Sequence, residues 1–138
     1  STDNSTQNLM SIRCGTGGSI DTGNNYSWGC NDGSGNQQAS GSSGTDYFRC
    51  IPTVHSGASH IFTGDITFRR ATHSEGTAYS GWIITSLMGD INNNHFMASG
   101  GRWATTAAME RVQVYNAGGR GYDSGGRMIV TVATGYGY

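Results

Sequence analysis

The stretch "SHIFTGDITFRR", residues 59–70, decides the fold class because its apolar side chains recur at alternate positions. In an extended chain, alternate residues point to the same face. One face then carries Phe62, Ile66 and Phe68, and the other carries Thr63, Asp65, Thr67 and Arg69. This period of two indicates a half-buried β-strand.

The next patterned stretch, "AYSGWIITSLMG" at residues 78–89, is apolar on both faces. Its two faces carry Tyr79, Ile83 and Leu87 on one side, and Trp82, Ile84 and Met88 on the other. A strand of an antiparallel sheet usually needs only one buried face. The pattern therefore predicts a strand that is central in its sheet, or one whose second face meets another subunit.

The rest of the chain supports an all-β fold of one domain. The 138 residues include 23 glycines and one proline, and aromatic and β-branched residues fill the short segments between turn signals. Such residues fit a pleated surface, and repeated short strands are typical of a sandwich. Further strands are expected at 9–13, 26–30, 46–51, 95–98, 109–115 and 127–134. We predict a jelly-roll-like antiparallel β-sandwich over residues 9–138, preceded by an arm or linker end at residues 1–8.

Two glycine-rich stretches connect these segments. "NDGSGNQQASGSSG", residues 31–44, has too few apolar side chains to offset its ordering entropy, so we expect a long surface loop or a segment ordered by a neighbouring subunit. "NAGGRGYDSGG", residues 116–126, lacks the following helix and the lysine of a phosphate-binding loop. It is interpreted as a hairpin connection whose glycines allow positive φ angles.

Catalytic and metal-binding patterns are weak. Asp90, Asn92 and Asn94 match the first ligands of a calcium loop, but the glycine and glutamate that such a loop requires are missing. The four histidines have no partner at metal-ligand spacing, and no serine lies in a nucleophile elbow. We therefore expect no enzyme activity, no metal and no cofactor.

The three cysteines all lie in the first half of the chain. In an oxidising compartment, Cys14 and Cys30 are the candidate disulfide, and it would close a short loop. The alternative is that Cys14, Cys30 and Cys50 are buried reduced thiols that act as small apolar side chains.

Aromatic residues with polar tips are the candidate ligand-binding residues. They lie in or beside the expected loops, where a ring could stack on the face of a sugar, and they are Tyr26, Trp28, Tyr47, Trp103 and Tyr122. The alternative is that tyrosine and tryptophan close the ends of the sandwich core.

The charge balance and the length of the apolar runs exclude two classes of partner. The formal net charge is −1 and charged residues make up 12 % of the chain, so no basic patch for nucleic acid is visible. No apolar run reaches the roughly 18 residues of a membrane helix. We expect no nucleic-acid partner and no membrane insertion.

The segment "GGRWATTAAMERVQVYNAGGRGYDSGGRMIVTV", residues 100–132, resembles the C-terminal pattern of bacteriophage tail-fibre and related virion head domains. There, a tryptophan turn leads through a strand to a glycine-rich loop and a final strand. The matching positions are Gly101, Trp103, Met109, Val112, Val114, Tyr115, Tyr122, Gly125 and Gly126. "ASHIFTGDITFRR", residues 58–70, looks like the central strand of those domains. This chain departs from the pattern of those domains at two places: Gly126 stands where serine is usual, and the final strand ends in "VATGYGY".

The resemblance implies a non-enzymatic structural or attachment protein of a virion. It would assemble as a homo-oligomer, with a trimer expected, and attach to other virion proteins or to cell-surface glycans. Two alternatives are a secreted carbohydrate-binding lectin and the subunit of an extracellular filament. Sharp sugar selectivity by an isolated monomer would distinguish the lectin.

Overall fold

The computed structural model describes residues 10–33, 39–50, 62–71, 81–90 and 95–116, and within these ranges all regular structure is β-strand. Two antiparallel sheets pack against each other, so the predicted all-β, jelly-roll-like sandwich is confirmed. The predicted arm at 1–8, the glycine-rich connection after Asn116, Tyr122 and the expected strand at 127–134 lie outside the described residues.

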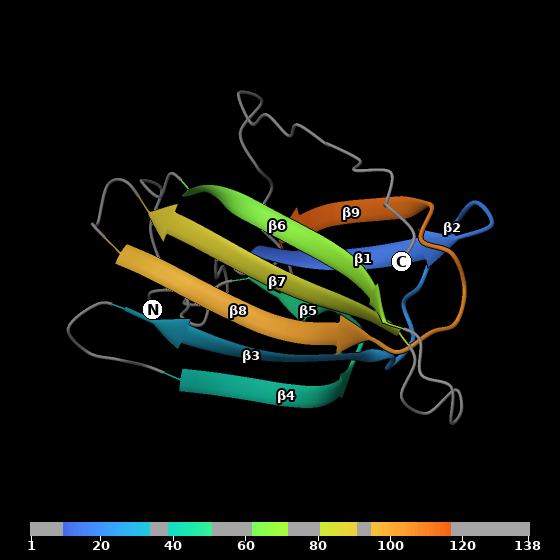
Figure 1. The fold of residues 1–138 in the computed structure, drawn as a ribbon, viewed down its shortest axis with the longest axis horizontal. Coiled ribbons are helices and arrows are strands. Elements are labelled where there is room, and N and C mark those ends of the chain that lie inside the picture. Colours follow the sequence, from blue (N-terminus) through green and yellow to red (C-terminus); the bar gives the residue numbers. More distant parts are fainter. Residues whose placement is uncertain (1–9, 34–38, 51–61, 72–80, 91–94, 117–138) are drawn as a thin grey trace, which may run out of the picture.

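The large sheet contains five strands in the order β4-β3-β8-β7-β6 (Figure 1). Their bounds are β3 Tyr26–Asp32, β4 Ala39–Thr45, β6 Phe62–Ala71, β7 Gly81–Asp90 and β8 His95–Trp103. β7 pairs with β6 from Gly81 to Asp90 and with β8 from Trp82 to Asp90, an interior position that agrees with its apolar side chains on both faces. Among the described strands, β6 pairs with β7 alone. Because residues 117–138 lie outside the described part of the chain, the likeness of this segment to a central strand stays a prediction.

The small sheet is built around β1 (Met10–Thr16). β9 (Arg111–Asn116) pairs with β1 from Met10 to Gly15. β2 (Ser19–Ile20) and β5 (Phe48–Arg49) are two-residue strands that also pair with β1. Of these two short strands, β5 also contributes Phe48 to the core between the sheets, whereas Ser19 of β2 is exposed.

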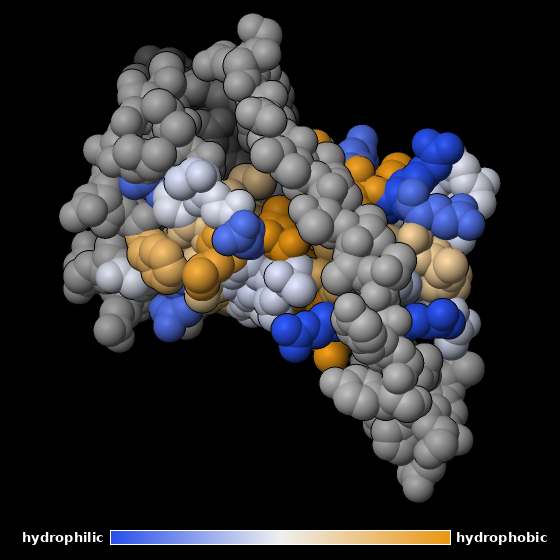
Figure 2. All heavy atoms as spheres, turned by 45° about the horizontal axis from the view of Figure 1, so that its top comes forward, coloured by the Kyte–Doolittle hydropathy of each residue, from blue (hydrophilic) through white to orange (hydrophobic). Residues whose placement is uncertain are grey.

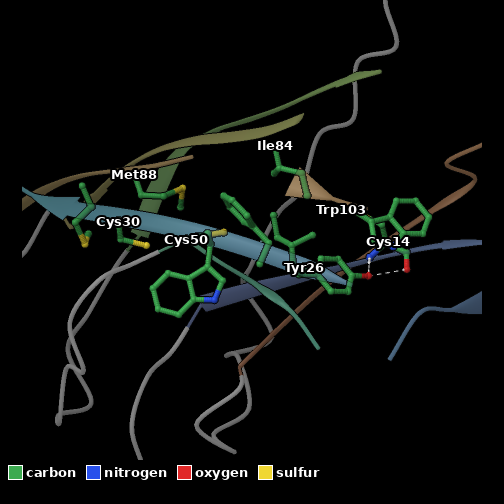
Figure 3. Packing of buried hydrophobic residues seen from close by; sticks show 11 residues of the cluster. Cys14, Tyr26, Cys30, Cys50, Ile84, Met88 and Trp103 are labelled. Atoms are coloured by element: carbon green, nitrogen blue, oxygen red, sulfur yellow. Dashed lines mark hydrogen bonds between the residues drawn. The ribbon is translucent and has the colours of Figure 1, made fainter. Parts of the chain in front are cut away.

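The core lies between the inner faces of the two sheets (Figure 3). The small sheet and the residue after β5 contribute Ile12, Cys14, Phe48 and Cys50, and the large sheet contributes Tyr26, Trp28, Cys30, Ile84, Met88, Met97 and Trp103. Burying each of the larger apolar side chains stabilises the fold by about 1.5–3 kcal/mol. The alternation predicted for β6 is confirmed: Ile66 and Phe68 pack against this core, whereas Thr67 and Arg69 are exposed.

The expectation of a long loop at residues 31–44 is wrong at both ends, because Asn31 and Asp32 belong to β3 and residues 39–44 belong to β4. Residues 39–45 form β4, which pairs with β3 from Tyr26 to Asn31. Glycine and serine side chains give β4 no apolar pattern, and its described positions from Gly41 to Gly44 are exposed. The strand therefore forms through backbone hydrogen bonds to β3, which a hydrophobic pattern cannot reveal.

Candidate functional site

Two of the predicted ligand-stacking residues, Tyr26 and Trp103, lie in the core. Each is only 1 % exposed, and their rings stack on each other with centroids 6.3 Å apart. The Tyr26 hydroxyl accepts a hydrogen bond from the Cys14 amide at 2.8 Å and lies 3.1 Å from the Cys14 carbonyl oxygen (Figure 3). The structure thus corrects the stacking hypothesis for this pair: they close one end of the sandwich and present no free ring face to a sugar.

Asp21 links this aromatic pair to the loop before β3. The Trp103 indole N–H donates to Asp21 Oδ2 at 2.7 Å, and the Asn25 amide and the Gly23 backbone N–H also donate to this carboxylate. Burial by itself raises the pKa of Asp21, but these three hydrogen bonds outweigh it and lower the pKa. A charged carboxylate therefore orients the Trp103 ring.

The other two described candidates, Trp28 and Tyr47, stack on each other with centroids 6.5 Å apart. Trp28 is a core residue, and the Arg49 guanidinium lies 5.3 Å from its ring centroid. Tyr47 is half-buried and meets Tyr115 edge-on. The structure brings these rings together at the edge of the core, and of the predicted set Tyr47 alone keeps a partly exposed ring among the described residues.

The candidate disulfide between Cys14 and Cys30 does not form, and all three cysteines are free, buried thiols. Cys14 belongs to the small sheet, and its backbone amide lies against the Tyr26 hydroxyl of the large sheet. Cys30 lies on the same strand as Tyr26 but four residues further along, which at the usual rise places it about 13 Å from Tyr26. A disulfide requires Cα atoms within about 7 Å. Figure 3 shows Cys30 near Cys50, with Cys14 at the other end of the core.

These buried thiols predict a loss of stability in alkali. Burial, assisted by nearby Asp21, raises the pKa of Cys14 to about 12, and burial also raises the pKa of Cys30 and Cys50. A raised folded-state pKa contributes stability that is complete below the unfolded value, about 8.5, and lost as the pH rises toward the folded value. We expect the free energy of unfolding to fall above about pH 8.5, by about 1.4 kcal/mol per pH unit for each such thiol.

Urea unfolding between pH 7 and 11, followed by tryptophan fluorescence, measures this slope. Cys14→Ala should make the slope shallower by the contribution of one group, whatever its effect on stability at pH 7. An unchanged slope in this variant would show that Cys14 ionises equally in both states.

Among the described residues, the exposed large apolar side chains lie on the outer face of the large sheet. Ile83 and Leu87 on β7 are 45 % and 48 % exposed, and Phe96 on β8 is 55 % exposed. Leu87 pairs with Ala98, two residues from Phe96, so these two side chains are diagonal neighbours on one face. In Figure 2, hydrophobic atoms are exposed beside strongly hydrophilic ones. We call Ile83, Leu87 and Phe96 the apolar stripe.

Next to the apolar stripe, three glycines lie in register across neighbouring strands. Gly41 on β4 pairs with Gly29 on β3, which pairs with Gly100 on β8. With Asn31 and Ala98, they line a shallow open depression of about 500 Å³. Glycine within a strand often marks a place where a ligand or another backbone approaches closely. The depression therefore has a flat backbone floor.

The two-sided pattern of β7 includes Ile83 and Leu87, but no signal in the sequence indicated Phe96 or the glycine row. Phe96 lies in the short apolar run "HFMA", where alternation is too brief to assign a face. The glycine row exists only through the cross-strand register. Asp90 of the rejected calcium loop is buried at the end of β7, and Asn92 and Asn94 lie outside the described residues.

The described residues contain neither a cluster of metal ligands nor a membrane-spanning helix. Within them, no group of three or more His, Cys, Asp or Glu side chains could hold a metal ion. The same residues contain no helix that is long and apolar enough to span a bilayer. Comparison of the chain with known protein families, curated proteins and solved structures finds no match.

Proposed function

We propose that this protein is a non-enzymatic structural or attachment subunit of a virion, which acts by assembling with copies of itself and with other virion proteins. The observation that carries the proposal is the apolar stripe, because three large apolar side chains about half-exposed on one sheet face favour burial by a partner. The virion setting rests on the tail-fibre resemblance of residues 100–132.

Self-assembly is the first expected result. Sedimentation velocity of the purified chain at micromolar concentration should give the mass of an oligomer, because covering the apolar stripe removes its surface from water. A monomer at every concentration up to about 100 μM, well above the micromolar Kd of a weak specific interface, would contradict the proposal.

The virion setting has its own test. An antibody raised against the purified chain should label intact virus particles from the same source in immunogold electron microscopy. Labelling confined to filaments outside cells would favour the filament subunit instead.

A carbohydrate-binding lectin is the second candidate, favoured by the open glycine-floored depression beside Asn31. A sugar ring could lie on the flat floor, with the Asn31 amide as a hydrogen-bond partner for its hydroxyls. Selective glycan-array signals that disappear in Gly29→Val would support a lectin. The control is Gln113→Asp, an exposed position on the small sheet.

A further inference from the structure

The register of the large sheet arranges its outer face in rows across the strands. The central row contains Thr67, Thr85, Gly100, Gly29 and Gly41. The row on one side contains Asp65, Leu87, Ala98 and Asn31, and the row on the other side contains Arg69, Ile83, Arg102 and Ser27. One flanking row is therefore acidic and the other basic, and each carries one branched apolar side chain of β7.

The charges of β6 cannot neutralise each other within one copy. Asp65 and Arg69 lie four residues apart on the same strand, about 13 Å at the usual rise. Both side chains are exposed, and neither makes an ion pair with another residue in the described part of the chain. They are thus available to an external partner with the opposite order of charges.

We propose that the partner is a second copy of this chain, packed through the same outer face about a two-fold axis that runs across the strands through the central row. This rotation exchanges the two flanking rows. Asp65 of each copy then faces Arg69 of the other, and Leu87 faces Ile83. The inference rests on the proposed function, and it specifies the face and the register of the self-assembly.

The alternative two-fold axis, along the strands, is disfavoured by the same charges. It would keep each row over the same row of the second copy. The basic row, which carries Arg69 and Arg102, would then lie over the basic row of the second copy. Like charges placed opposite each other suppress association. With the axis across the strands, Arg102 instead faces Ala98, whose small side chain leaves room for it.

The size and relief of the face suit this contact. Five strands by the ten residues of β7 give a face of about 24 by 33 Å, or roughly 800 Å² per copy. Stable interfaces bury about this area on each partner. The glycines and threonines of the central row let two sheets approach to the usual spacing of about 10 Å with nearly aligned strands.

A contact between identical faces closes at two copies, so this face forms a dimer rather than the expected trimer.

Charge exchange tests the register. Sedimentation velocity over a concentration series would measure the dimer Kd of the full chain, of Asp65→Arg, of Arg69→Asp and of the double variant. Each single reversal should weaken the dimer by about tenfold or more, because it places like charges opposite each other. The double variant restores opposite charges and should return to within about threefold of the original Kd. A double variant that is no tighter than the singles would overturn the proposed register.

A second comparison tests the face itself. Leu87→Asp should abolish the dimer while circular dichroism stays unchanged, since the side chain is exposed; the matched control is Gln113→Asp on the small sheet. A dimer that survives Leu87→Asp, or a trimer, would overturn this inference and leave the proposed self-assembly standing. A full chain that stays monomeric would refute both.

Discussion

Replacing Trp103 by alanine is expected to lower the free energy of unfolding by about 3–5 kcal/mol, the range for removing a large buried aromatic side chain. Trp103 is 1 % exposed and stacks on Tyr26. Its removal leaves a cavity at one end of the sandwich, between β8, β3 and the loop that contains Asp21. Chemical denaturation followed by circular dichroism, at a concentration below the dimer Kd, measures the change.

Trp103→Phe separates the ring from its hydrogen bond. Phenylalanine keeps an aromatic ring beside Tyr26 but cannot donate to Asp21, so we expect a smaller loss of about 1–3 kcal/mol. The pKa of Asp21 should also rise, because one of the hydrogen bonds that lower it is gone. A lowered folded-state pKa contributes stability that is lost as the pH falls. The loss of stability at acid pH should therefore be smaller in Trp103→Phe than in the original chain. An unchanged dependence of stability on acid pH would show that the hydrogen bond from Trp103 does not lower the pKa of Asp21.

The parts of the fold that were predictable from the sequence are those in which side chains alternate. Ile66 and Phe68 of β6 could be assigned to the buried face from the sequence, because burial in a strand repeats every second residue. β4 was not predicted, because this strand is formed by backbone pairing with β3 and not by a pattern of buried side chains. The pattern of β7 is apolar on both faces, so it did not show that Ile83 and Leu87, rather than Ile84 and Met88, would lie on the outer face.

The roles of the aromatic residues were not predictable, because they depend on contacts between distant positions. The Trp103 indole donates to a carboxylate 82 positions earlier in the chain, and the Tyr26 hydroxyl reaches backbone 12 positions away. Composition alone cannot distinguish a ring that closes a core from one that stacks on a ligand. The cysteines are similar: Cys14 and Cys30 are 16 positions apart, but topology places them at different ends of the core.

Gly101→Ala is expected to destabilise the large sheet by about 3 kcal/mol, at the upper end of the usual range for overpacking. A Cβ atom at Gly101 would overlap the backbone carbonyl oxygen of Ser27 and lie 2.7 Å from the Trp28 Cα. Backbone atoms of β3 cannot move aside as a flexible side chain would. The neighbouring strands β3 and β8 would have to separate along the register that joins Trp28 to Gly101.

The matched control is Gly100→Ala, one residue earlier on the same strand. A Cβ there meets nothing within 4 Å in the described part of the chain, because it points to the open outer face. Alanine also reduces the conformational freedom of the unfolded chain, so this variant should be neutral or more stable by about 0.4–1 kcal/mol. Thermal and urea unfolding of the two variants should therefore change in opposite directions. Equal stability would mean that β8 does not approach β3 as closely at Gly101 as the register requires, and the position of Trp103 in the core would then need another explanation.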